Sequence, residues 1–189
     1  FEGGSILKAD YGQLEFRVAG FLSKCPVVLQ EILDGVDAHA YTASIIFGKT
    51  KEDADFKEYR QQAKAHTFKP LYGGMSGSED EVTYYKAFLK KFTGVKQWHE
   101  ELKSEALTTH RVRILSGREY SFPGARRLPG GYVKYTTQIV NYPVQGFATG
   151  DLVPLGCIAT HRILRKHPEL KSLLILTVHD DLEADVYPG

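Results

Sequence analysis

The most informative segment for the fold is LLILTVHDDLEADV, residues 173–186. It begins with an apolar run and then alternates, since Leu182, Ala184 and Val186 are separated by acidic residues. Because successive side chains of a strand point to opposite faces, the pattern predicts two strands, residues 173–178 and 182–186. The second strand should be buried on one face and wet on the other. The turn would be His179-Asp180-Asp181, which places two carboxylates at the tip of a hairpin.

A further carboxylate ends a strand near the start of the chain, because residues 5–10 read as a short strand that finishes at Asp10. Two divalent ions about 3.5–4 Å apart must share ligands, so a two-metal phosphoryl-transfer site needs carboxylates from separate strands. Mg²⁺ prefers such oxygen ligands. Asp10, Asp180 and Asp181 are therefore candidate metal ligands. Taken singly, each is more simply an ordinary turn residue.

The residues between these strands predict a largely helical region and hence an α+β fold with an antiparallel sheet. A capping box, Ser78 with Glu81, begins one helix, and Gly94 fits its end. Apolar spacing and turn residues predict the other elements: helices over residues 14–33 with a break near Cys25-Pro26, 38–47, 53–68 and 95–109, a hairpin of 111–115 with 118–122, and a buried helix over 147–164.

The helix predicted over residues 53–68 carries two cations and an aromatic residue on one stripe. Arg60, Lys64 and Phe68 are spaced i, i+4 and i+8, so they share a helix face. Such a face could hold a triphosphate and cover a base. Nucleotidyl transfer asks for metals at the reacting phosphate together with cations on the departing pyrophosphate. Alone, the stripe is more often a solvated helix face.

The composition is that of an ordinary globular protein, with 42% hydrophobic and 25% charged residues. No apolar run approaches the roughly 20 residues of a membrane span and no secretory signal precedes the first strand, so we expect a cytoplasmic location and no membrane partner. The two cysteines, Cys25 and Cys157, lack the spacing of a metal site and are expected as reduced thiols.

The net charge is only +1, yet the charges are unevenly distributed. Between Lys86 and Lys134 there are eleven Lys and Arg residues against four Asp and Glu, so the rest of the chain is acidic. A basic middle with acidic flanks suits a protein that holds a phosphate backbone in one region and metal cations in another. From charge alone, a solvated charge run is the simpler interpretation.

Five motifs, in order, resemble those of the family A DNA polymerases, and the similarity covers nearly the whole chain. DYGQLEFR, residues 10–17, is similar to the first palm motif, usually DYSQIELR. RQQAKAHTFKPLYG, residues 60–73, resembles the fingers motif RxxxKxxxFxxxYG, and VHDD, residues 178–181, resembles the second palm motif, VHDE. DAH, residues 37–39, and NYPVQG, residues 141–146, also match.

The resemblance implies a two-metal reaction that joins a dNTP to a primer 3′-hydroxyl and releases pyrophosphate. Asp10 and Asp180 would bind two Mg²⁺ ions, for which Mn²⁺ could substitute, aided by the Tyr11 carbonyl. Arg60 and His39 would contact the outer phosphates. Lys64 would grip the triphosphate and is a candidate to protonate the pyrophosphate.

Further roles follow from the same resemblance. Phe68 would stack over the incoming nucleotide, and Tyr72 would lie beside the templating base. Closing of this helix would complete the site, an induced-fit check on pairing. Glu15 would be the steric gate against a ribose 2′-hydroxyl, with Gln13 nearby. Three residues would follow the primer terminus through minor-groove acceptors that are nearly the same for every correct pair: Asn141, Gln145 and His179.

Several positions depart from the family pattern. Asp181 replaces the usual Glu, and its shorter side chain is expected to reach a metal only through water. Gly12 replaces Ser, and Thr137 stands where bacterial members carry an arginine near the primer. Lys69-Pro70 should kink or end the fingers helix, so the position of Tyr72 is less defined. The same Lys-Pro pair is more similar to phage members of the family than to bacterial repair enzymes. Phe68 in place of Tyr predicts discrimination against dideoxynucleotides.

We therefore expect a palm of residues 1–36 and 136–189 and a mostly helical fingers subdomain of residues 37–135, acting in a bacterium or a phage-infected host cell. The chain begins at Phe1 without a methionine and ends just past its last strand, so it is expected to be a fragment. A thumb and a possible exonuclease domain would lie on the missing part. The 189 residues alone are expected to bind primer–template DNA poorly and to extend no primer.

Two alternatives remain at this point. One is a single-subunit phage-type RNA polymerase, which shares the palm and a similar fingers helix; Glu15 opposes it, because a gate against the 2′-hydroxyl would exclude its own substrate. The other is a non-catalytic nucleic-acid-binding palm, which the intact Asp10, Asp180, Lys64 and Arg60 oppose.

Overall fold

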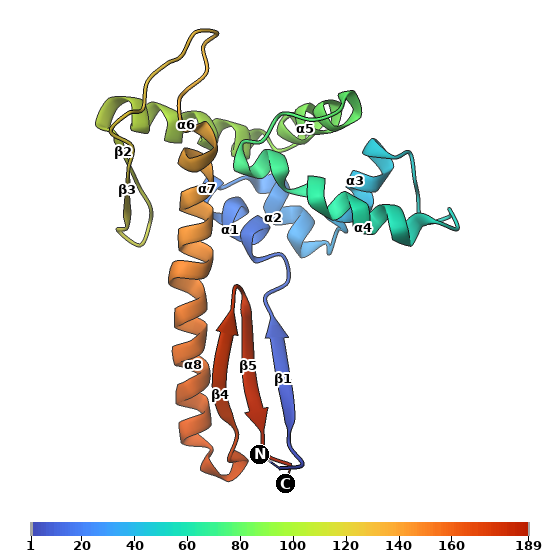
Figure 1. Cartoon of the computed structure of the whole chain (residues 1–189), viewed down its shortest axis with the longest axis vertical. Coiled ribbons are helices and arrows are strands. Elements are labelled where there is room, and N and C mark those ends of the chain that lie inside the picture. Colours follow the sequence, from blue (N-terminus) through green and yellow to red (C-terminus); the bar gives the residue numbers. More distant parts are fainter. Residues whose placement is uncertain (1, 189) are drawn as a thin grey trace. The chain divides into compact units, whose positions relative to one another are not determined.

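The computed structural model describes residues 2–188, and residues 1 and 189, the outer ends of the two predicted palm segments, lie outside that range. The chain divides into two compact units (Figure 1). The sheet unit comprises the residues up to Glu15 and those from Gln145 onward, and the helical unit is Phe16–Val144.

The sheet unit contains a three-stranded antiparallel sheet. Its strands are β1 (Ser5–Asp10), β4 (Leu173–Val178) and β5 (Asp181–Val186), in the order β1-β5-β4. The register pairs Ser5 with Val186 at one end and Asp10 with Asp181 at the other. The expected α+β class with an antiparallel sheet is confirmed. The hairpin turn is one residue shorter than predicted, because Asp181 already belongs to β5.

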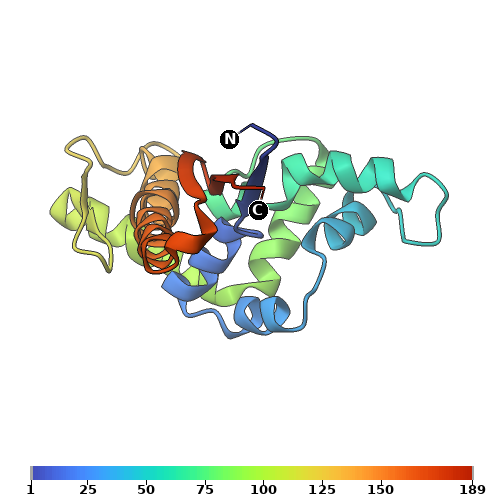
Figure 2. The ribbon, with the colours of Figure 1, turned by 90° about the horizontal axis from the view of Figure 1, so that it is seen from below.

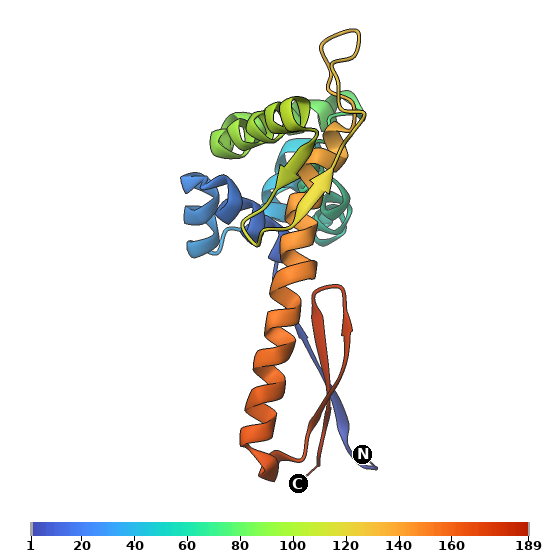
Figure 3. The same ribbon diagram turned by 90° about the vertical axis from the view of Figure 1, so that its left-hand side faces the viewer.

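The sheet is far less buried than the alternating sequence predicted. Every residue of β5 is of intermediate exposure and every residue of β1 is exposed. The helix α8 (Val153–Lys166) contacts the sheet at β4 (Figure 3). The prediction of one buried face is therefore wrong for the described residues, because one helix does not cover a three-stranded sheet.

The helix predicted over residues 147–164 is also different from expectation. Its place is taken by α7 (Thr136–Phe147), a π-helical stretch (Ala148–Leu152) and α8, and only Val153 of α8 is buried. The sequence did not predict α7, because Pro143 lies inside it and a proline normally interrupts a helix. The predicted burial of α8 is wrong, since its apolar Leu155, Ile158 and Ile163 are exposed.

The helical unit follows the predicted order of elements, and its α3 and α4 lie side by side (Figure 2). Proline starts α2 after the predicted break, and Ser78 and Glu81 form the predicted capping box through bonds of 3.3 Å and 2.6 Å. The elements are α1 (Leu14–Ser23), α2 (Pro26–Leu33), α3 (Ala38–Ile46), α4 (Phe56–Thr67), a 3₁₀ turn (Lys69–Tyr72), α5 (Glu79–Lys91), α6 (Thr93–Thr109), β2 (Arg111–Arg113) and β3 (Glu119–Ser121).

Gly94 does not end α5, as the sequence suggested, but lies in the first turn of α6. A Cβ there would come within 2.8 Å of the Cα of Cys25, so close packing against the break between α1 and α2 explains the glycine. Two buried clusters hold the unit together: aromatic residues of α5 such as Tyr84 and Phe88, and an aliphatic cluster around α6, β2 and α7. None of the helices in residues 2–188 is both long and apolar enough to span a membrane.

Candidate active site

Three carboxylates lie together at one end of the sheet. The register makes Asp10, the last residue of β1, the direct partner of Asp181, the first residue of β5. Asp180 lies in the turn before β5, and its carbonyl accepts a hydrogen bond from the Tyr11 backbone N–H at 3.4 Å. Pairing of the first and last strands thus brings Asp10 and Asp181, which are 171 positions apart in the sequence, to one end of a sheet.

The carboxylates repel one another. Although Asp10 is an exposed residue, desolvation by its neighbours raises its pKa, and the negative charges of Asp180 and Asp181 and a hydrogen bond with Asp180 act in the same direction. Lys8 opposes this shift. Its Nζ lies 2.5 Å from Asp181 Oδ2 and 3.8 Å from Glu183 Oε1, and Asp181 in turn raises the pKa of Lys8. This end of the sheet therefore carries concentrated negative charge that one lysine partly offsets.

These residues fit a divalent cation by charge and by ligand chemistry. Within residues 2–188, no three His, Cys, Asp or Glu side chains are gathered closely enough to form a complete metal site. Asp10 and Asp180 are nevertheless neighbouring oxygen donors joined by a hydrogen bond, and a cation would offset their negative charge. Asp181 is less available than Asp10, because its carboxylate is already paired with Lys8.

Sequence reasoning did not identify Lys8. The signal was present, since residues two apart on a strand lie on the same face, and Lys8 is two residues before Asp10. Sequence reasoning also did not predict that the Tyr11 side chain packs against Gly156. The Tyr11 hydroxyl lies so close that a Cβ on Gly156 would be 2.2 Å from its oxygen. No pattern in the sequence connects residues so far apart.

Gln13, Glu15, Gln145 and His179 also belong to the sheet unit. Glu15 is half-buried and accepts a hydrogen bond from the Gln145 side-chain amide. Burial raises the pKa of Glu15, whereas the bond from Gln145 and the nearby His179 act to lower it. Gln13 and His179 are exposed and have left-handed backbones, with φ of 54° and 56°. Glu15 is therefore held by Gln145, and Gln13 and His179 face solvent.

In the helical unit, Arg60 of α4 is bound to Asp37. Its Nε donates to Asp37 Oδ2 at 2.7 Å and its Nη2 donates to Oδ1 at 3.1 Å. Asp37 also caps α3, because Oδ1 accepts from the Ala40 N–H at 3.0 Å. Burial would raise the pKa of Asp37, but the bonds from Arg60 and Ala40 outweigh it and lower the pKa. Asp37 is thus an ionised partner for Arg60.

His39 and Phe68 lie near this pair. The Nδ1 of His39 is 2.9 Å from the Thr67 hydroxyl, and its ring meets Phe68 edge-on with centroids 5.4 Å apart. Burial and the positive charges of Arg60 and Lys64 lower the pKa of His39, while Asp37 acts the other way. Phe68 stacks on Phe16 at 5.2 Å. The lowered pKa favours the neutral imidazole of His39, and Nε2 is its remaining polar atom.

The predicted stripe on α4 is only partly helical. α4 begins three residues later than expected and ends at Thr67, so Phe68 is the cap residue, and Pro70 is the second residue of the 3₁₀ turn that follows. Lys64 is exposed on the last turn of α4. Phe68 is half-buried. A proline so close to the helix end accounts for the shift, since it cannot donate the next backbone bond.

Tyr72 and Asn141, both expected to contact DNA or nucleotide, have buried polar atoms that find no partner within residues 2–188: the Tyr72 hydroxyl and the Asn141 Oδ1. The backbone around Tyr72 is tightly fixed. Gly73 ends the 3₁₀ turn with φ of 75°, and a Cβ there would lie 2.9 Å from Val140 Cγ2. Buried polar atoms without partners are uncommon and mark positions where a ligand could supply the bond.

The predicted residues thus fall into two groups. The sheet unit gathers Asp10, Asp180, Asp181, Tyr11, Gln13, Glu15, Gln145 and His179, and the helical unit gathers Arg60, Lys64, His39, Phe68, Tyr72 and Asn141. The first group offers carboxylates for cations. The second offers cations and an aromatic ring for an anion with a flat base.

Known proteins are similar to this chain in sequence and in fold. The sequence model described as DNA polymerase family A matches residues 2–189. DNA polymerase I of Aquifex aeolicus is 31% identical over 96% of this chain and 32% of its own length. DNA polymerase I of Helicobacter pylori is 31% identical over 94% of this chain and 20% of its own length. The chain therefore spans about a fifth to a third of these relatives.

A solved structure has the same fold. It is the POL domain of Pol1 from M. smegmatis, in complex with a DNA primer-template and dNTP. The likeness has a TM-score of 0.80 at 24% identity and covers all of this chain and 35% of that one. At this identity the likeness establishes the arrangement of helices and strands.

Proposed function

Because this chain belongs to DNA polymerase family A, we propose that it is the catalytic core of a template-directed DNA polymerase. The reaction would transfer a nucleotide from a dNTP to a primer 3′-hydroxyl and release pyrophosphate. The observation that carries the proposal is the strand register, which pairs Asp10 with Asp181 and brings Asp180 against Tyr11. Carboxylates from separate strands are what a two-metal site requires.

Asp10 and Asp180 would hold both metal ions together with the Tyr11 carbonyl. Two Mg²⁺ ions, or Mn²⁺ in their place, would activate the primer hydroxyl and neutralise the charge that develops on the phosphate. Asp181 would take part through water, because its carboxylate lies 2.5 Å from Lys8 Nζ. Lys8 would then orient Asp181, a positioning role.

Arg60, Lys64 and His39 would bind the triphosphate. Lys64 is exposed, and its ammonium group would contact the phosphates and supply a proton to the departing pyrophosphate. Arg60 would give up one of its two hydrogen bonds to Asp37 and donate to a phosphate oxygen instead. Carboxylate and phosphate oxygens are both good acceptors for the planar guanidinium. His39 would donate from Nε2 in its protonated form, which a bound phosphate favours, because the single hydrogen of the neutral ring lies on Nδ1: Nδ1 donates to the Thr67 hydroxyl, whose own hydrogen goes to the Ala63 carbonyl.

Phe68 would stack on the incoming base and Tyr72 would lie beside the templating base. Glu15 would select deoxyribose by occupying the space of a 2′-hydroxyl, and the bond from Gln145 would fix it there. Gln13 would assist near the sugar. Asn141 and His179 would contact the primer terminus, where the unpaired Oδ1 of Asn141 could accept a bond.

Primer–template DNA and dNTPs would be the partners of this core. In this proposal residues 1–36 and 136–189 act as the palm and residues 37–135 as the fingers. The chain spans about a fifth to a third of the relatives named above, so a thumb and an exonuclease domain would lie elsewhere in a longer polypeptide. A cytoplasmic place of action and the likeness to phage members stay predictions.

The test is primer extension by the longer polypeptide that carries this chain. Changing Asp10 or Asp180 to Ala should abolish extension while primer–template binding persists, because the carboxylates would act on the reaction and not on the DNA backbone. Loss of DNA binding in parallel with extension would instead indicate a structural role. Equal use of ribonucleotides and deoxynucleotides would favour an RNA polymerase.

A further inference from the structure

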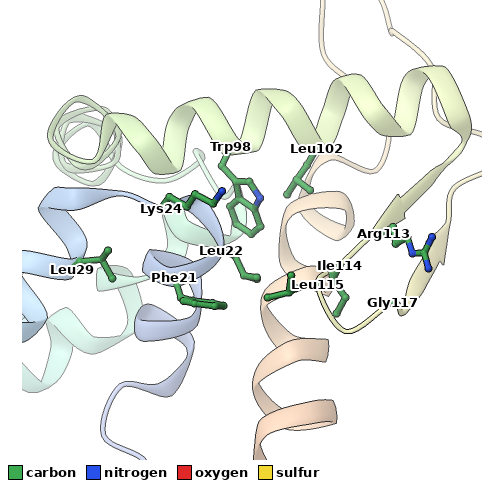
Figure 4. A pocket seen from close by; sticks show the side chains of 10 residues that line it. All are labelled: Phe21, Leu22, Lys24, Leu29, Trp98, Leu102, Arg113, Ile114, Leu115 and Gly117. Atoms are coloured by element: carbon green, nitrogen blue, oxygen red, sulfur yellow. The ribbon is translucent and has the colours of Figure 1, made fainter.

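The helical unit contains an apolar groove that has no part in the site described above. A hollow of about 710 Å³ lies between α1, the start of α2, α6 and the turn of the hairpin β2–β3 (Figure 4). This volume is within the range of binding pockets, about 300–1,000 Å³. Its walls are mainly the side chains of Phe21, Leu22, Trp98, Leu102, Ile114 and Leu115.

The groove has a buried floor and an exposed apolar rim. Leu102 and Ile114 form the floor, with 5% and 7% of their surfaces exposed. Phe21 and Leu115 stand at the rim, with 53% and 71% exposed. Single exposed apolar residues are normal, but several gathered around one hollow mark an interaction surface.

Leu115 is at the rim because of the hairpin turn. Gly117 N–H donates to the Ile114 carbonyl at 2.9 Å, and Ile114 N–H donates to Arg118 at 3.0 Å. Gly117 has φ of 87°, a conformation that the turn requires and glycine adopts without strain. Such turns favour polar residues, so nothing in the turn itself calls for a leucine. The rim is therefore preformed, which lowers the entropic cost of binding.

Two cations flank the apolar surface, Lys24 at one end and Arg113 at the other (Figure 4). Lys24 ends α1 with φ of 50°, where glycine or asparagine is usual, and no described residue forms a salt bridge with its side chain. The Arg113 side chain is 68% exposed, with Glu119 at 4.0 Å. No carboxylate lines the hollow. The groove thus presents apolar side chains framed by positive charge.

A second hollow continues the groove along α6. It has a volume of about 580 Å³ and shares Leu22, Lys24 and Trp98 with the first. Its other walls are mostly polar and include Gln97 and Glu101. Two hollows in a row, one apolar and one polar, fit an extended occupant better than a compact small molecule.

We propose that this groove binds an acidic amphipathic peptide segment of a partner protein. Apolar side chains of the segment fill the hollow between Phe21, Trp98 and Leu115, and its carboxylates pair with Lys24 and Arg113. Docking of an apolar helix face into such a groove is a common mode of peptide recognition, and complementary charge sets its orientation. A nucleic acid is disfavoured, because its affinity comes from many phosphate contacts and the groove offers two cations.

The groove provides its own probe, because Trp98 is the only tryptophan of the chain. The ligand for the test is a synthetic peptide of about 15 residues, roughly four helical turns, with Leu and Phe along one face and Glu elsewhere. Binding to the 189-residue chain should shift Trp98 emission to shorter wavelength and raise the anisotropy of the labelled peptide. A peptide with the same apolar face but Lys in place of Glu should bind at least about tenfold more weakly, equivalent to ~1.4 kcal/mol.

Variants locate the binding. Leu115→Asp should weaken the Glu peptide about tenfold or more, whereas Leu33→Asp, at a leucine that is 80% exposed but outside the groove, should not. Lys24→Glu should weaken the Glu peptide and strengthen the Lys peptide, with Lys51→Glu as the matched control. Circular dichroism establishes that each variant is folded.

Three results overturn the proposal: no binding of the Glu peptide, equal binding of both peptides, or equal effects of Leu115→Asp and Leu33→Asp. A labelled single-stranded oligonucleotide provides a further test. If it shifts Trp98 emission, displaces the Glu peptide and binds with higher affinity than that peptide, the proposal is overturned and the groove is assigned to nucleic acid. None of these measurements depends on polymerase activity.

Discussion

Arg60 holds Asp37 through two hydrogen bonds, from Nε at 2.7 Å and from Nη2 at 3.1 Å. Asp37 also caps α3, so the carboxylate is fixed in place before any ligand binds. A phosphate would have to compete with Asp37 for the same guanidinium. The pair therefore determines how much of Arg60 is available to a triphosphate.

Asp37→Asn tests this competition. Asparagine still caps a helix well, but its neutral side chain holds Arg60 less strongly. We expect the affinity for a nucleoside triphosphate to rise by about two- to tenfold, the equivalent of ~0.4–1.4 kcal/mol, when measured by displacement of a fluorescent nucleotide. Arg60→Ala should lower the affinity. A weaker affinity in Asp37→Asn would show that Asp37 orients Arg60 for the phosphate.

Gly156 and Tyr11 should be energetically coupled. Alanine in place of a helical glycine normally adds about 0.5–1 kcal/mol to stability, but a Cβ on Gly156 would lie 2.2 Å from the Tyr11 hydroxyl. Gly156→Ala should therefore bring little or no gain alone and a gain of ~0.5–1 kcal/mol in a Tyr11→Phe background. Urea unfolding of the four proteins gives the coupling. Identical effects of Gly156→Ala in both backgrounds would contradict the contact.

His99 should make the helical unit sensitive to acid. Burial and the positive charge of the nearby Lys103 lower the pKa of His99 to about 4. Two weaker effects act to raise it: a hydrogen bond with the backbone of Leu71 and the negative charge of Glu100. The unfolded chain, with a histidine pKa near 6.5, binds the proton first. Stability should therefore be complete above about pH 6.5 and fall as pH drops toward about 4, by on the order of 3 kcal/mol.

The measurement is the unfolding free energy of His99→Gln against the parent chain from pH 4 to pH 7. The pH dependence should be smaller in His99→Gln, while His161→Gln, at an exposed histidine of α8, should keep the slope of the parent. A slope that is unchanged in His99→Gln would remove His99 as its source.

Glu15 should set the sugar selectivity of the proposed polymerase. Glu15→Ala should raise ribonucleotide incorporation relative to deoxynucleotide incorporation by about tenfold or more, because it opens the space of the 2′-hydroxyl. Gln145→Ala should give a smaller change in the same direction, since it removes the bond that fixes Glu15. The ratio of kcat/KM values in primer extension measures both. An unchanged ratio in Glu15→Ala would show that another residue is the gate.

Local signals in the sequence were sufficient for much of the fold. The hairpin tip follows from a turn between two apolar strands, the break between α1 and α2 follows from Pro26, and the start of α5 follows from its Ser78 capping box. Each depends on residues that are close in sequence. The α+β class could be predicted for the same reason.

Other features depend on packing between distant residues. Pro143 concealed α7, and Gly94 looked like a helix end because its contact with Cys25 is not visible in the sequence. The alternation in β5 predicted a buried face, but burial depends on what covers the strand. For the candidate site, the carboxylates could be placed at strand ends, whereas the pairing of Lys8 with Asp181 required the register.

Single-turnover primer extension is the direct measurement of whether Asp10 and Asp180 support metal-dependent triphosphate chemistry. The longer polypeptide is mixed with primer–template and a matching dNTP, with Mg²⁺ added at increasing concentration. We predict that extension requires Mg²⁺ and that it is lost in Asp10→Asn and in Asp180→Asn. The affinity of both variants for primer–template should stay within about twofold of the parent, equivalent to ~0.4 kcal/mol. Normal extension by either variant, or extension without a divalent cation, would contradict the account.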